Sequence, residues 1–133
     1  MKSPLMYIRF VIHKNDEYSG RRQGLFQAMG SLEEDGLLLK HELAQYGELY
    51  NWFRHNLKEP QSFTRSSKPH AKKVALSWFK DTATEHIAKM HEIAHILEAH
   101  GIGVNLLRTE RPGYVVYEDM YQLTAEPFQE TLT

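Results

Sequence analysis

The sequence predicts one α+β domain over residues 1–133, in the order β-α-α-α-α-β-β-β, with a mainly antiparallel sheet packed against the helices. Three observations predict this class. Residues alternate between two faces at the start of the chain, apolar residues recur at helical spacing in its middle, and three short strand-like segments close it. Helices in the middle and strands at the end favour α+β over an alternating parallel α/β fold.

The first strand is expected over residues 5–13, because Met6, Ile8, Phe10 and Ile12 share one side of an extended chain. A polar segment with two glycines follows and predicts a turn. A short helix is expected from Leu25 to about residue 35, with its apolar residues at helical spacing.

The longest apolar stripe predicts a helix over residues 39–57 that ends before Pro60. Its members are spaced four and three residues apart and are Leu39, Leu43, Tyr46, Tyr50, Phe53 and Leu57. Pro69 can be the first residue of a further short helix that carries Val74, Ala75 and Trp78.

The last helix is expected over residues 82–100, because Thr82 and Glu85 have capping-box spacing and Gly101 can end a helix. Strands are expected over residues 102–108, 114–118 and 121–126. Between the first two, proline and glycine at positions 112 and 113 suit a type II turn.

Composition limits the compartment and the chemistry. The chain has 41% hydrophobic residues and no cysteine, which excludes disulfide scaffolds and thiolate metal sites. It has no apolar run long enough to span a membrane, and no small-residue cleavage site follows its N-terminal stretch, so we expect a cytoplasmic protein and no membrane partner.

Charge is divided unevenly along the chain. Residues 1–80 hold 13 Lys and Arg against 8 Asp and Glu, a net +5, whereas residues 81–133 hold 3 against 9, a net −6. Oppositely charged halves can face each other within the fold or across a homodimer, so this asymmetry alone identifies no partner.

One motif suggests an enzyme. Residues 91–97 read HEIAHIL and resemble the active helix of small gluzincin-type zinc peptidases. The resemblance implies that His91 and His95 bind zinc and that Glu92 acts as the general base. However, the candidates for a third ligand (Glu110, Glu118 and Glu126) lie in expected turns or strands, and both histidines fall beside the apolar stripe of their helix.

A second constellation is basic. Arg65, Lys68, Lys72 and Lys73 surround the helix start expected at Pro69, where free amides and cations can bind a phosphate or another small anion. The aromatic residues Trp78 and Phe79 could stack on nucleic-acid bases, although a core tryptophan is the commoner explanation.

The sequence therefore favours a small binding, accessory or regulatory protein without an evident catalytic site and without a cofactor. Its contact surface is expected over residues 65–73, and its partner is an unidentified protein or a small anionic ligand. Two alternatives stay open. One is a zinc-dependent hydrolase built on His91, Glu92 and His95, and the other is a nucleic-acid- or phosphate-binding protein that uses the basic segment.

Overall fold

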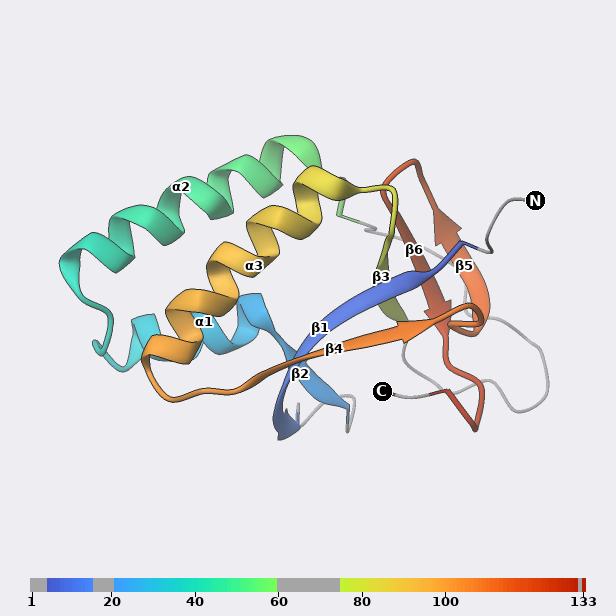
Figure 1. Cartoon of the computed structure of the whole chain (residues 1–133), viewed down its shortest axis with the longest axis horizontal. Coiled ribbons are helices and arrows are strands. Elements are labelled where there is room, and N and C mark those ends of the chain that lie inside the picture. Colours follow the sequence, from blue (N-terminus) through green and yellow to red (C-terminus); the bar gives the residue numbers. More distant parts are fainter. Residues whose placement is uncertain (1–4, 16–20, 60–74, 132) are drawn as a thin grey trace. The chain divides into compact units, whose positions relative to one another are not determined.

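A computed structural model describes residues 5–15, 21–59, 75–131 and 133 (Figure 1). Its elements, in chain order, are β1 (Tyr7–Asn15), β2 (Arg22–Gly24), α1 (Leu25–Glu34), α2 (Lys40–Asn56), β3 (Leu76–Lys80), α3 (Thr84–Ala99), β4 (Val104–Thr109), β5 (Tyr114–Glu118) and β6 (Gln122–Glu126). Neighbouring strands follow the order β2-β1-β3-β6-β5, and β4 pairs with β1. The pairings β1–β2, β1–β3, β3–β6 and β5–β6 are antiparallel, which confirms the predicted α+β class.

The described residues form two compact units. The sheet unit comprises the described parts of residues 1–9, 60–87 and 106–133, and the helical unit comprises the described parts of 10–59 and 88–105. Three elements, β1, α3 and β4, contribute residues to both units. One domain over residues 1–133 therefore stays a prediction.

The sheet unit is built around β6. This strand lies between β3 and β5, and all five of its residues are buried. Leu123 and Ala125 supply apolar contacts, while Thr124 hydrogen-bonds Ser77 across the ladder at 2.9 Å. Trp78 of β3 is 1% exposed and forms part of the same core, as its apolar character predicts.

A partly buried carboxylate organises the turn between β5 and β6. Asp119 accepts hydrogen bonds from the backbone amides of Tyr121 and Gln122 and from the side chains of Tyr117 and Gln122. Burial alone would raise the pKa of Asp119, but these hydrogen bonds to its charged form outweigh burial and lower the pKa. The turn begins with Asp119, and β6 therefore starts at Gln122, one residue later than expected.

The helical unit packs α1, α2 and most of α3 around apolar side chains. In α1, the buried residues Leu25, Ala28, Met29 and Leu32 follow helical spacing, as the sequence predicts. Two contacts near opposite ends of α2 join it to α3: Glu42 pairs with His100, which follows α3, at 2.8 Å, and Lys89 lies 5.0 Å from the centre of the Trp52 ring. The start of α2 thus lies beside the end of α3, and the end of α2 lies beside the first half of α3, so the two helices run antiparallel (Figure 1).

Gly101 ends α3 as predicted. Its φ is 77°, and the Gly101 and Ile102 amides donate hydrogen bonds to the carbonyls of Glu98 and Leu97. None of the helices among the described residues has the length and hydropathy needed to cross a membrane.

Three predictions about local structure were wrong. The third expected helix, after Pro69 with Trp78 as a member, is strand β3 where it is described, because Leu76 and Trp78 alternate inward and pair with β6. Arg22–Gly24, expected as part of a turn, is β2, paired with β1. Finally, α3 begins at Thr84, so Ala83 precedes its first residue and Thr82 is too early for the predicted cap.

Candidate functional site

Helix α2 has apolar side chains both on its buried face and on its exposed surface. Its buried residues are Glu42, Tyr46, Leu49 and Phe53. By contrast, three members of the predicted stripe are open to solvent: Leu39 is 57% exposed, Leu43 is 44% exposed and Tyr50 is 47% exposed. The apolar stripe predicted from the sequence therefore lies at the edge of the buried face of α2, and three of its six residues are exposed to solvent.

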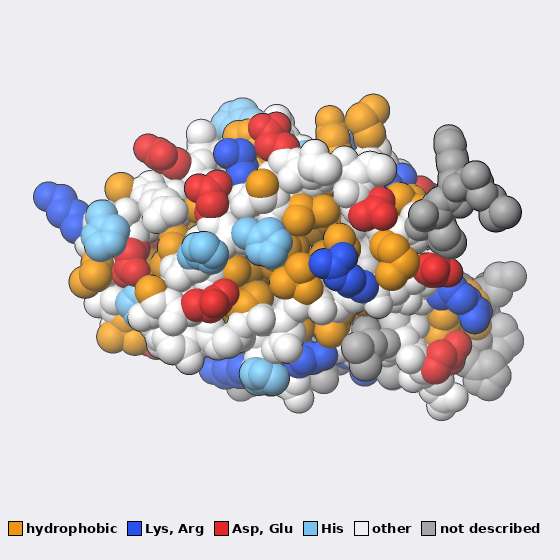
Figure 2. All heavy atoms as spheres, viewed as in Figure 1, with side chains coloured by type: hydrophobic (Ala, Val, Ile, Leu, Met, Phe, Trp, Pro, Cys, Tyr) orange, Lys and Arg blue, Asp and Glu red, His pale blue; other side chains and the backbone are white. Residues whose placement is uncertain are grey.

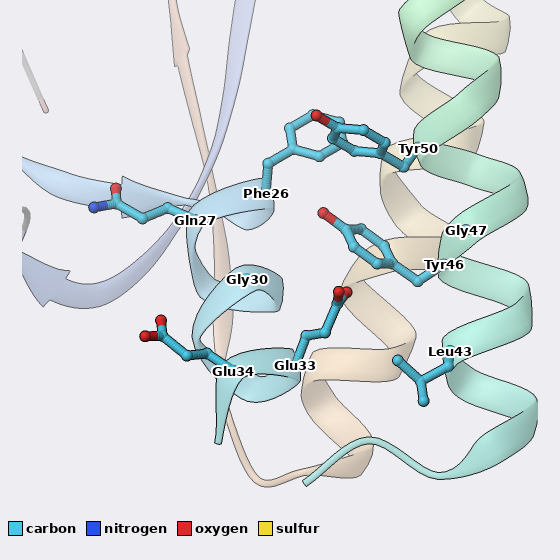
Figure 3. Close-up of a pocket in the computed structure, with 9 residues that line it drawn as sticks. All are labelled: Phe26, Gln27, Gly30, Glu33, Glu34, Leu43, Tyr46, Gly47 and Tyr50. Carbon is cyan, nitrogen blue, oxygen red and sulfur yellow. The ribbon is translucent and has the colours of Figure 1, made fainter. Parts of the chain in front are cut away.

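This surface is one wall of a groove within the helical unit, between α1 and α2. The groove has a volume of about 940 Å³ (Figure 3). From α1 it is lined by Phe26, Gln27, Gly30, Glu33 and Glu34, and from α2 by Leu43, Tyr46, Gly47 and Tyr50. Its size lies within the range of ligand-binding clefts, and the two helices place apolar and acidic groups in it together.

Aromatic rings form the apolar end of the groove. Phe26 meets Tyr50 edge to face with ring centroids 6.1 Å apart, and it meets the buried Phe53 in the same way at 5.2 Å. The rings of Tyr46 and Tyr50 lie 6.0 Å apart and are inclined at 50°. The rings therefore hold one another in fixed orientations while part of Tyr50 stays accessible.

Tyr46 adds a polar group to this apolar wall. Its side chain is 7% exposed, yet its hydroxyl points into the groove and makes no hydrogen bond to any described residue (Figure 3). Burial, with the neighbouring Tyr50 and Glu33, raises the pKa of Tyr46 to about 12. The phenol therefore stays neutral near neutral pH and can donate or accept a hydrogen bond.

The opposite end of the groove is acidic. Glu33 and Glu34 occupy the last turn of α1, and Asp35 follows them. In Figure 3 the Glu33 carboxylate reaches toward Tyr46, whereas that of Glu34 points away from α2. The C-terminal end of a helix carries partial negative charge, so carboxylates there are locally unfavourable and a cation beside them is favourable.

Glycines line both walls of the groove. Gly30 lies inside α1 and Gly47 inside α2; neither has a positive φ, and a Cβ atom added to either would have no neighbour within 4 Å. Neither backbone geometry nor close packing therefore requires glycine. Each costs its helix about 1 kcal/mol relative to alanine.

Contacts from outside the groove fix the start of α2. The backbone N–H of Leu39 donates a hydrogen bond of 2.9 Å to Oε1 of Glu42, which is only 6% exposed. This hydrogen bond and the one to His100 lower the pKa of Glu42 against the opposing effect of burial. The wall of the groove formed by α2 is thus anchored by a charged carboxylate behind it.

The histidines of the HEIAH motif lie elsewhere, on α3. His91, Glu92 and His95 are all exposed, and Figure 2 shows histidine side chains at the surface over this helix. The His91 ring meets Phe10 edge to face, with centroids 5.1 Å apart. Among the described residues, no three His, Asp or Glu side chains are placed to hold a metal ion together.

His86 sits on the apolar stripe of α3, and the structure places it in the sheet unit. It is 4% exposed, and its ring centroid lies 4.4 Å from that of Tyr121 and 6.2 Å from that of Phe79.

The basic residues Arg65, Lys68, Lys72 and Lys73 fall outside the described part of the chain, so the contact surface expected there stays a prediction.

Sequence reasoning missed the groove. Two signals were available: the apolar arc of α2 is wide, since Leu49 lies beside the expected stripe, and two glycines interrupt otherwise helical patterns.

Comparison with known proteins finds no matching family model, no matching curated protein and no matching solved structure. The case for a function therefore rests on the geometry of the groove.

Proposed function

We propose that this protein acts by binding, as an accessory or regulatory module, and that the groove between α1 and α2 receives an extended or helical segment of a partner protein. The observation that carries the proposal is the pair of glycines. Gly30 and Gly47 weaken two facing helices at positions where alanine would fit, and both positions line the same groove. A requirement for open space accounts for both.

The composition of the lining supports a protein segment as the occupant. Leu43, Tyr50 and Phe26 offer apolar surface to alternate side chains of a peptide, while Tyr46 and Glu33 offer polar contacts. Helix-lined apolar grooves bind peptides through a few anchoring side chains of this kind.

A peptide selection tests the proposal. Random peptides displayed on phage are selected against the protein and counter-selected against a Leu43→Asp variant, which places a charge on the groove wall. Recovered peptides are then titrated into labelled protein. We expect amide resonances of α1 and α2 to shift, and binding to the variant to be about tenfold weaker, because a desolvated carboxylate would oppose an apolar contact.

A matched control separates the groove from the rest of α2. Gln45 is exposed on the same helix and does not line the groove, so a Gln45→Asp variant carries the same new charge outside the site. It should bind the selected peptides like the wild type. Peptides that shift resonances elsewhere, or that bind both variants equally, would contradict the proposal.

The same proposal includes a cytoplasmic location, supported by the absence of cysteine and of an apolar segment that could span a membrane. A homodimer is a further proposal, supported by the opposite charges of residues 1–80 and 81–133. Sedimentation at two salt concentrations tests it, since association driven by these charges would weaken as salt rises.

A further inference from the structure

We infer that the groove selects a positively charged side chain, lysine or arginine, in the partner's segment, and that this cation lies beside Tyr46, between the aromatic end that contains Tyr50 and the carboxylate of Glu33. This inference rests on the proposed function, because it specifies the ligand of the same groove. It goes further in naming the chemical group that anchors the segment. Three features of the groove carry it: its charge, the arrangement of its rings and the polar group of Tyr46.

The charge of the groove lacks a counterpart. No lining residue is lysine or arginine, and the last turn of α1 contains no basic residue. Glu33 and Glu34 form no ion pair with any described residue. Their repulsion from the partial negative charge of the helix end would be relieved by a bound cation, so the groove is electrostatically complementary to a basic group.

The rings are inclined to one another rather than stacked in parallel. Tyr50 is inclined at 50° to Tyr46 and at 72° to Phe26, so the ring faces point in different directions. The face of an aromatic ring attracts an ammonium or guanidinium group within roughly 6 Å of its centre. Several inclined rings beside a carboxylate make a common receptor for an organic cation on an apolar stem.

Tyr46 completes the set of contacts. Its hydroxyl is aimed into the groove and has no hydrogen-bond partner among the described residues, while the residue as a whole is 7% exposed. An N–H of lysine or arginine can donate to this oxygen, and Glu33 can accept a second N–H. The helical unit already uses related chemistry where Lys89 lies over Trp52.

The experiment compares probes of similar size and different charge. We would titrate n-butylammonium, neutral 1-pentanol and pentanoate into the full chain and follow the side-chain resonances of Phe26, Tyr46 and Tyr50 by NMR. Butylammonium should give saturable shifts, pentanol should bind about fivefold to tenfold more weakly, and pentanoate should be rejected by Glu33.

Two pairs of variants assign the effect. Glu33→Gln should weaken butylammonium binding about threefold to fivefold, whereas Glu34→Gln makes the same change in net charge and should have little effect, because its carboxylate points away from α2. Tyr50→Phe keeps a ring and should preserve binding, while Tyr50→Leu keeps apolar bulk without a π face and should weaken it about fivefold. Unfolding curves check that each variant is folded.

The outcomes separate this inference from the proposed function. Equal binding of pentanol and butylammonium would overturn the selection of a cation and leave a groove that accepts apolar groups. Equal effects of the two glutamate variants would also overturn it, because only a general field would then act. By contrast, if none of the selected peptides binds at the groove of the wild-type protein, the proposed function itself is refuted.

Discussion

Replacement of Gly47 by alanine should stabilise the protein, and the size of the effect follows from the structure. Gly47 lies well inside α2, and an added Cβ atom would meet no heavy atom within 4 Å. No clash offsets the gain in helix propensity and no new packing adds to it. The free energy of unfolding should therefore rise by about 0.5–1 kcal/mol, the difference between glycine and alanine inside a helix.

Urea denaturation followed by circular dichroism measures this change, and thermal unfolding checks it. For a chain of 133 residues the entropy of unfolding is roughly 0.28 kcal/mol/K, so 1 kcal/mol corresponds to about 4 °C. Gln45→Ala is the control, since it changes an exposed residue of α2 outside the groove and should alter stability by less than about 0.5 kcal/mol. A destabilised Gly47→Ala variant would mean that glycine is needed for folding, and the main support for the binding proposal would be lost.

Three further predictions concern the rest of the chain. Gly113→Ala should lower the free energy of unfolding by about 3 kcal/mol, because φ is 144° and the new Cβ would lie 2.6 Å from the carbonyl carbon of Glu126. Gly101→Ala has the same kind of backbone strain, at φ 77°, but open space around the new Cβ, so it should lower the free energy of unfolding by only about 1–2 kcal/mol in the same urea assay. The pKa of Glu42 is lowered in the folded state, so the stability that its charged form contributes is complete above the ordinary pKa of 4.5 and is lost as pH falls through the lowered pKa. The free energy of unfolding of Glu42→Gln should therefore fall less steeply at acid pH than that of the wild type. An equally steep fall in both proteins would contradict this prediction. Elemental analysis of untagged protein should find no stoichiometric zinc; one zinc per chain that disappears in His91→Ala would instead favour the hydrolase.

Much of the fold could be predicted because it depends on local patterns. The strand at the start of the chain (β1), the apolar spacing of α1 and the glycine after α3 are set by neighbours in sequence, and each was confirmed. Strand β3 could not be recognised in the same way. Five residues with Trp78 at the centre fit a helix or a strand equally well, and pairing with β6, which follows more than forty residues later, decides between them.

The groove was harder to predict for a related reason. Periodicity shows that Leu43 and Tyr50 share a helix face with Tyr46, but it does not show how far a neighbouring helix covers that face. Coverage depends on where α1 lies, and thus on the Phe26 contacts with Tyr50 and Phe53. The HEIAH histidines have the spacing of a zinc-binding motif, which sequence alone can show, but His91 and His95 are exposed on α3.

The most direct test of the binding proposal is the affinity of one selected peptide for the wild type and for the Gly30→Ala, Gly47→Ala double variant. Both glycines line the groove, so we expect the two new methyl groups to take up space there, while both helices would become more stable. We predict that calorimetry will show at least about tenfold weaker binding to a protein with a higher free energy of unfolding. Undiminished affinity in the stabilised double variant would show that the space between α1 and α2 is not where the partner binds.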